Sequence, residues 1–204
     1  PDDPAVLEAR IMQWLYRHQY APAIQALQAA LGRSDAASGG AGDYRYLLGL
    51  AQRLSGDAAA AHATWQDARD RLEALQRTAP DEPAIAADLG LVYSGLGDKD
   101  KAMAEAQRAM QLQPAAKDAT AGPAWQEQRA RVEAQTGQNE RALADLEQLL
   151  QTPYRSVFYG TGITPSLLRQ DPAWDPLRGD PRFAALLKKF PDSKPMGAMP
   201  AKHG

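Results

Sequence analysis

Apolar side chains recur along most of this chain at steps of three and four residues, the spacing that places them on one face of an α-helix. The clearest stripe follows steps of four, three, four and three residues: Ala61, Trp65, Ala68, Leu72 and Leu75. Similar stripes predict eight helices in four pairs, over residues 4–31, 43–78, 83–116 and 123–151. We therefore expect an all-α fold.

Short breaks rich in Gly, Pro and Asp separate the predicted helices. At residues 55–57 (Ser-Gly-Asp) we expect a turn, because glycine adopts the left-handed conformation that ends a helix and Asp57 can cap the next one. Residues 79–83 should break the long helix before them, and residues 118–122 should form another connector. Residues 32–42 have the composition of a loop.

One two-helix unit recurs at a nearly constant period. The turn glycines Gly56, Gly97 and Gly137 are 41 and 40 residues apart. Small residues follow the turns at steps of 38, 41 and 40 residues: Ala23, Ala61, Ala102 and Ala142. A small side chain is expected there because the two helices of a pair cross closely. The period predicts four copies of one helix pair.

The central unit carries a family signature, in which Leu89-Gly90 is followed by Tyr93, Ala102 and Pro114. This spacing resembles the tetratricopeptide repeat (TPR), a two-helix unit of ~34 residues. Ala86 stands where that family usually has Trp, and Ala106 where it has Phe. The resemblance implies a TPR-type α-solenoid of about four helix pairs over residues 1–151. Its signature residues would be Leu48, Gly49, Ala61, Leu89, Gly90, Tyr93, Ala102 and Ala142.

The pattern changes after Gln151. Residues 152–164 lack helical periodicity and are predicted to be irregular. Three Asp-Pro steps follow, each a predicted capped helix start: Asp171-Pro172, Asp175-Pro176 and Asp180-Pro181. Because a solenoid needs a terminal cap, residues 152–190 are expected to cover the open end of the array, with three anchors: Trp174, Leu177 and Phe183. Residues 191–204 have the composition of a flexible tail.

Residues 167–183 carry a second resemblance. They run Leu-Leu-Arg-Gln-Asp-Pro-Ala-Trp-Asp-Pro-Leu-Arg-Gly-Asp-Pro-Arg-Phe, which resembles the ending of repeat arrays in multidomain bacterial signalling proteins. Those proteins are eukaryotic-like Ser/Thr kinases, adenylate cyclases and winged-helix regulators, and their arrays often follow a transmembrane helix. The resemblance implies an effector domain upstream of Pro1, with a transmembrane Ser/Thr kinase as the first hypothesis and the repeats on its periplasmic side. A cytoplasmic location stays open. The absence of Met at position 1 suggests an excised fragment.

Composition narrows the function classes. The formal net charge is −2 and no basic stripe occurs, which argues against nucleic acid or an anionic membrane as partner. Cysteine is absent, so disulfides, thiolate metal sites and a cysteine nucleophile are excluded. No apolar run approaches the ~20 residues of a membrane span. We expect no direct membrane insertion by these residues.

Candidate catalytic chemistry is weak. His18, His62 and His203 are far apart in sequence and show no paired metal-ligand spacing. The glycine clusters at residues 39–42 and 160–162 lack the preceding strand and the Lys-Ser/Thr of a phosphate loop. The protein-kinase motifs are also absent. We expect a non-catalytic domain with no metal or cofactor.

Binding is the better hypothesis, because the first helices of each TPR pair line a concave groove. The TPR resemblance places a partner-binding set on that face: Tyr16, Tyr46, Leu50, Arg53, Leu91 and Arg131. The Lys/Asn/Arg clamp of chaperone-binding members is missing, so the expected ligand is another protein or peptide. Arg53 and Arg131 are expected to stay out of the core, since an unpaired buried charge is costly. Met12 and Leu91 could equally pack against neighbouring helices.

Two alternatives remain open. The chain could be a free-standing adaptor or assembly factor, with self-association into a homodimer as a variant. It could also be the repeat region of an adenylate cyclase or a winged-helix transcriptional regulator. An enzyme is the weakest hypothesis.

Overall fold

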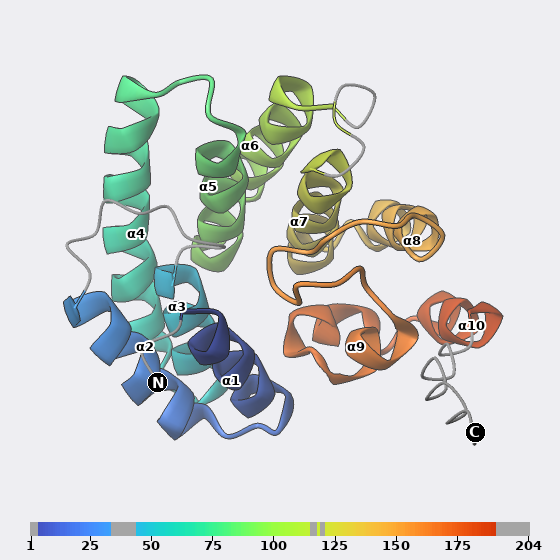
Figure 1. Cartoon of the computed structure of the whole chain (residues 1–204), viewed down its shortest axis with the longest axis horizontal. Helices are drawn as coiled ribbons and strands as arrows, with labels where there is room; N and C mark the ends of the chain where they lie inside the picture. The colour runs from blue at the N-terminus through green and yellow to red at the C-terminus, as the bar shows by residue number, and fades with distance from the viewer. Residues whose placement is uncertain (1–3, 34–43, 115–117, 119–120, 191–204) are drawn as a thin grey trace, which may run out of the picture.

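A computed structural model describes residues 4–33, 44–114, 118 and 121–190. Within these residues the protein contains helices and no β-strand (Figure 1), which confirms the all-α class. The first eight helices follow the predicted order: α1 (Pro4–Tyr16), α2 (Tyr20–Arg33), α3 (Tyr44–Leu54), α4 (Ala58–Thr78), α5 (Pro83–Leu96), α6 (Lys99–Leu112), α7 (Ala121–Thr136) and α8 (Asn139–Leu149). Three short helices end the described chain: α9 (Pro165–Gln170), the 3₁₀-helix η1 (Pro172–Leu177) and α10 (Pro181–Lys189).

The helices pack in chain order. Each helix from α1 to α8 contacts the next, and α3, α5 and α7 also contact one another in sequence. Further along, η1 packs on α7 and α10 packs on α8. Apolar residues from α8, η1 and α10 share one hydrophobic core: Leu146, Leu149, Trp174, Leu177 and Phe183. The three anchors expected in the C-terminal segment are therefore buried against the last helix pair.

The turns inside the four pairs share a left-handed backbone conformation. Gly56, Gly97 and Gly137 have φ angles of 95°, 83° and 83°, and His18 takes the equivalent place in the first pair with φ 55°. Among the described residues His18 is the only non-glycine residue with positive φ. Its ring is held beside Tyr20, with Nδ1 2.6 Å from the hydroxyl oxygen. A residue with left-handed backbone therefore lies between the two helices of each of these pairs.

Close backbone contact joins the central pair. A Cβ added to Gly90 of α5 would lie 3.1 Å from the backbone nitrogen of Ala106 and 3.2 Å from the carbonyl oxygen of Ala102, both on α6. Trp65 of α4 fills the corresponding space one unit earlier. Its ring packs so tightly that a Cβ on Gly49 or on Gly95 would lie 2.3 or 2.6 Å from ring atoms. Glycine at these three positions lets the helices and the indole approach each other.

Two predicted element starts are wrong. The connector expected over residues 118–122 is shorter, because the Asp118 carboxylate caps the backbone N–H of Ala121 at 2.9 Å and α7 begins there. Pro123 then lies in the first turn, where a missing N–H costs nothing. The Asp175-Pro176 step lies inside η1 and starts no helix of its own. In so short a 3₁₀-helix, most backbone N–H groups have no hydrogen-bond acceptor within the helix. Proline, which lacks an N–H, is therefore tolerated there.

Three of the predicted helix caps agree with expectation. Asp57, Asp171 and Asp180 each accept a hydrogen bond from the first turn of the helix that follows. Residues 152–164 contain no helix or strand. Residues 32 and 33 of the expected loop belong to α2, while residues 34–42 and the expected tail over 191–204 lie outside the described residues.

Candidate functional site

The predicted groove residues lie on one face of the odd-numbered helices, but most of them are buried. Tyr46, Leu50, Leu91 and Arg131 are only 2%, 2%, 0% and 2% exposed, while Tyr16 and Arg53 are half-buried. We call this set the inner face. The expectation of an open groove is wrong for Tyr46, Leu50 and Arg131, since side chains with so little exposed area have no surface to offer a ligand in this arrangement. Leu91 follows the alternative left open for it and packs in the core.

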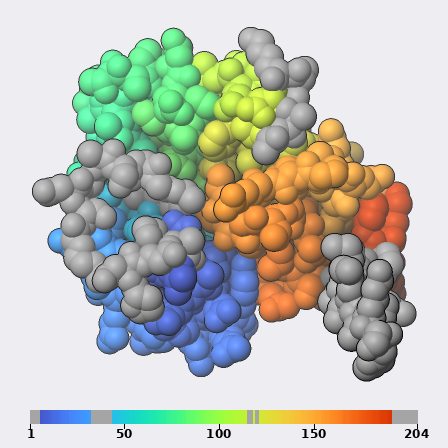
Figure 2. All heavy atoms as spheres, in the orientation of Figure 1, coloured from blue at the N-terminus to red at the C-terminus, as the bar shows by residue number. Residues whose placement is uncertain are grey.

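The chain's own residues 154–163 cover the inner face, and we call them the inserted segment. In Figure 1 this segment follows α8, crosses in front of α7 and turns beside α1 before α9 begins. Figure 2 shows its orange atoms between the blue N-terminal helices and the yellow-green of the third and fourth pairs. Phe158 is 7% exposed and belongs to the same hydrophobic core as Met12, Tyr46 and Leu91.

Arg131 is the centre of the contact between the inserted segment and the helices. Its guanidinium donates hydrogen bonds to Glu127 Oε1 at 2.9 and 3.2 Å and to Asp171 Oδ2 at 2.9 Å. It also donates to the hydroxyl oxygen of Tyr159 at 2.5 Å. Its Cζ lies 4.1 Å from the centroid of the Phe158 ring. The expectation that Arg131 stays out of the core is wrong, because two carboxylates and aromatic rings compensate its burial.

Tyrosine hydroxyls complete this cluster. Tyr159 donates to Asp171 Oδ2 at 2.6 Å, and Tyr154 donates to Glu127 Oε2 at 2.8 Å. Burial raises the pKa of both phenols well above the usual value, and the neighbouring carboxylates act in the same direction. The two hydroxyls therefore stay neutral donors, which suits a site with one cation between two carboxylates. Trp174 adds a donor from η1, with Nε1 3.2 Å from the Tyr159 oxygen.

Arg53 links four helices beside this cluster. Its guanidinium lies 5.4 Å from the centroid of the Trp65 ring and donates to Gln135 Oε1 at 3.0 Å. Gln135 in turn donates to the backbone carbonyl of Ala173 at 2.7 Å. Arg53 thus stays partly exposed, as expected, yet its charged group is already engaged by the protein.

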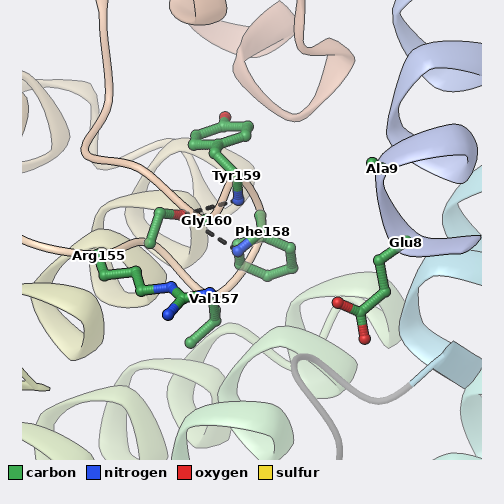
Figure 3. A pocket seen from close by; sticks show the side chains of 8 residues that line it. Glu8, Ala9, Arg155, Val157, Phe158, Tyr159 and Gly160 are labelled. Atoms are coloured by element: carbon green, nitrogen blue, oxygen red, sulfur yellow. Dashed lines mark hydrogen bonds between the residues drawn. The ribbon is translucent and has the colours of Figure 1, made fainter. Parts of the chain in front are cut away.

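A hollow of about 290 Å³ remains between α1 and the inserted segment. Its lining residues are Glu8, Ala9, Arg155, Ser156, Val157, Phe158, Tyr159 and Gly160. Figure 3 shows the Glu8 carboxylate on one side of the hollow and the Arg155 side chain on the other. Glu8 accepts a hydrogen bond from Tyr44 at 3.0 Å, whereas Arg155 is exposed and forms no hydrogen bond or salt bridge within the described structure. Three of its lining residues are exposed to solvent: Ala9, Arg155 and Gly160.

A second buried ionic group joins α7 to α8. Arg129 donates to both oxygens of Asp145, at 2.9 and 2.7 Å, and lies 3.7 Å from Glu133. Oε2 of Glu133 is buried and has no hydrogen-bond partner among the described residues. Burial and the neighbouring Asp145 carboxylate raise the pKa of Glu133 to about 7. This group faces α8 rather than the inner face.

In the part of the chain that the structure describes, no group of three or more His, Asp or Glu side chains could hold a metal ion. No helix in that part is long and apolar enough to cross a membrane. Comparisons with protein-family models, with curated proteins and with solved structures found no match.

Three residues of the inserted segment escaped the sequence analysis: Tyr154, Phe158 and Tyr159. A signal for them was present, since three large aromatic side chains in ten residues without periodicity must pack on something. The pattern along the chain gave no indication of what that surface is. Asp171 was predicted only as a helix cap, and it performs that role with Oδ1 while Oδ2 binds Arg131.

Proposed function

We propose that this chain is a TPR-type α-solenoid of four helix pairs with a C-terminal cap, and that it is a non-catalytic protein- or peptide-binding domain. Its context would be a bacterial signalling protein. The resemblance of residues 167–183 to the endings of such arrays favours a membrane-anchored Ser/Thr kinase, with the catalytic domain upstream and this domain in the periplasm. The recurring left-handed turns and the packing of α1 to α8 in chain order support the repeat assignment.

The inserted segment is the observation that carries the binding role. Within the described chain, the hydrogen bonds of its backbone groups join residues of the segment itself, such as Ser156 N–H to the Thr161 carbonyl at 3.2 Å. Its attachment to the helices is by side chains, through Phe158 and the hydroxyls of Tyr154 and Tyr159. A groove can hold a peptide turn in the same way, through a few anchor side chains.

Site-specific photo-crosslinking tests the binding role. A photoreactive amino acid at Ala9, which lines the hollow, should capture one polypeptide in cells of the native source. The same amino acid at exposed Gln66 on α4, away from the hollow, is the matched control. Capture of the same polypeptide from Ala9 and not from Gln66 is the expected result. Equal capture from both positions, or no capture from either, would show that this region is not the binding site.

The signalling context needs a separate measurement. An antibody against this domain should detect, in lysate of the native source, a membrane-bound polypeptide much larger than 22.1 kDa. Protease added to intact spheroplasts should cleave it from outside. A soluble species close to 22.1 kDa would instead identify a free-standing adaptor.

A further inference from the structure

We infer that the inserted segment occupies the domain's own ligand site, and that the ligand is a turn-forming peptide with an uncharged Tyr-x-x-x-Phe-Tyr pattern that takes its place. This inference rests on the proposed binding function and names the chemistry of the partner. The pattern is that of the segment itself, in which Tyr154, Phe158 and Tyr159 make the contacts to the helices.

Each element of the pattern meets a specific group of the inner face. The position of Phe158 requires a flat ring, because it stacks on the Arg131 guanidinium and fills the core between the odd-numbered helices. The two tyrosine positions require neutral hydroxyl donors, because they meet the carboxylates of Glu127 and Asp171. An anionic group at either position would be repelled by those carboxylates, so a phosphotyrosine should not bind.

The helices on either side of the segment have packing contacts of their own. Its two ends are held independently, since α8 packs on α7 and on α10, and η1 packs on α7. The backbone of the segment gives up no hydrogen bond to the helices when it leaves, because those bonds are internal to it. Departure would remove Phe158 and Tyr159 from Arg131 and Tyr154 from Glu127, on a face that the sequence analysis assigns to peptide binding.

A pair of single-cysteine variants measures this release, in a chain that contains no native cysteine. Ser156→Cys puts a thiol in the inserted segment at a side chain 2% exposed, and Ser94→Cys puts the same thiol on α5 at a side chain 8% exposed. If the segment never leaves the helices, the thiol at position 156 should be labelled no faster than the thiol at position 94, because it is more deeply buried. Release of the segment predicts labelling at least tenfold faster at position 156 than at position 94. Equal rates would overturn the inference.

Binding in trans tests the ligand pattern. The probe is a fluorescent peptide with the sequence of residues 152–163, and the receptor is the full chain carrying Phe158→Ala and Tyr159→Ala. This variant should bind the probe at least tenfold more tightly than the unaltered chain does. A probe with both residues changed to alanine, or with phosphotyrosine at position 159, should not bind. A folded variant that ignores the probe would overturn the inference.

The remaining outcomes are also decisive. If the double variant does not fold, the two serine-to-cysteine variants still give the answer, because each changes one oxygen to sulfur. If labelling of Ser156→Cys varies with protein concentration and the chain doubles in mass, the occupant is a second copy and the peptide-ligand inference fails. If crosslinking from Ala9 captures a partner while position 156 stays protected, the proposed function stands and this inference alone fails.

Discussion

Arg131 of α7 and Asp171 at the start of η1 form a salt bridge of 2.9 Å although they are 40 positions apart in sequence, and their side chains are only 2% and 1% exposed. The bridge fixes the C-terminal segment against the fourth helix pair. Together with Glu127 it places one cation between two buried carboxylates, and the hydroxyls of Tyr154 and Tyr159 supply the missing donors.

Replacing Arg131 with methionine should therefore be severely destabilising. Both carboxylates would stay buried without a cation, which costs on the order of 3–5 kcal/mol. Urea unfolding followed by circular dichroism measures the loss. Arg182→Met is the matched control, since the exposed Arg182 side chain pairs with Asp180 at the surface and its loss should cost far less stability. Similar losses in the two variants would mean that solvent reaches the Arg131 cluster.

The left-handed turns predict opposite effects for two glycine substitutions. A Cβ added at Gly97 or at Gly32 meets no atom within 4 Å, but only Gly97 has positive φ. Gly97→Ala should cost about 1–2 kcal/mol of backbone strain. Gly32→Ala, inside α2, should instead stabilise the protein by about 0.5–1 kcal/mol. Thermal unfolding of both variants checks the signs, and two changes of the same sign would contradict the assigned turn.

The close crossing of α5 and α6 predicts overpacking at Gly90. A valine there would push against the backbone of Ala102 and Ala106, so Gly90→Val should lose roughly 1–3 kcal/mol or more. Gly179→Ala is the control, because its added Cβ meets nothing within 4 Å. Chemical denaturation compares them. A change near zero for Gly90→Val would mean that the repeat register is misplaced.

Glu133 predicts a pH dependence of stability. Its pKa of about 7 in the folded protein lies above the ordinary value of 4.5, so the folded state binds more protons than the unfolded state between these values. Its contribution to stability is full below pH 4.5 and is lost as pH rises to about 7. At about 1.4 kcal/mol per pKa unit, the loss reaches roughly 3 kcal/mol.

Glu133→Gln tests this linkage because it removes the titration while keeping the size of the side chain. Unfolding free energies measured from pH 4 to 8 should fall with rising pH in the unaltered protein and stay flatter in the variant. Exposed Glu140, on the neighbouring helix, is the control position, and Glu140→Gln should keep the original slope. A slope that survives Glu133→Gln would assign the pH dependence to another group.

The sequence predicted the helices well because their signals are local. Apolar spacing, the capping carboxylates of Asp57 and Asp180 and the turn at Gly97 all act within a few residues. Predictions of helix starts were wrong where the same local sequence can occur in two structural settings. An Asp-Pro step can begin a helix, as at Asp171, or lie within one, as at Asp175.

The candidate site could not be predicted in the same way, because its contacts join distant residues. Tyr159 meets Tyr16 with ring centroids 6.5 Å apart, and Arg131 meets Asp171 across the whole of α8 and α9. Arg131 was predicted to lie on the surface because burying an isolated charge is costly. A pairing partner reverses that conclusion, and one sequence alone does not reveal which carboxylate is the partner.

Under the proposed peptide-binding function, the covalent attachment of the inserted segment sets an affinity threshold for ligands. A segment tied at both ends, to α8 and to α9, meets its site as an intramolecular partner, and short tethers of this kind give effective concentrations on the order of millimolar. A free peptide of equal intrinsic affinity would need a comparable concentration to displace it. The domain should therefore ignore weak, dilute peptides and respond only to ligands that bind much more tightly or are presented locally at high density.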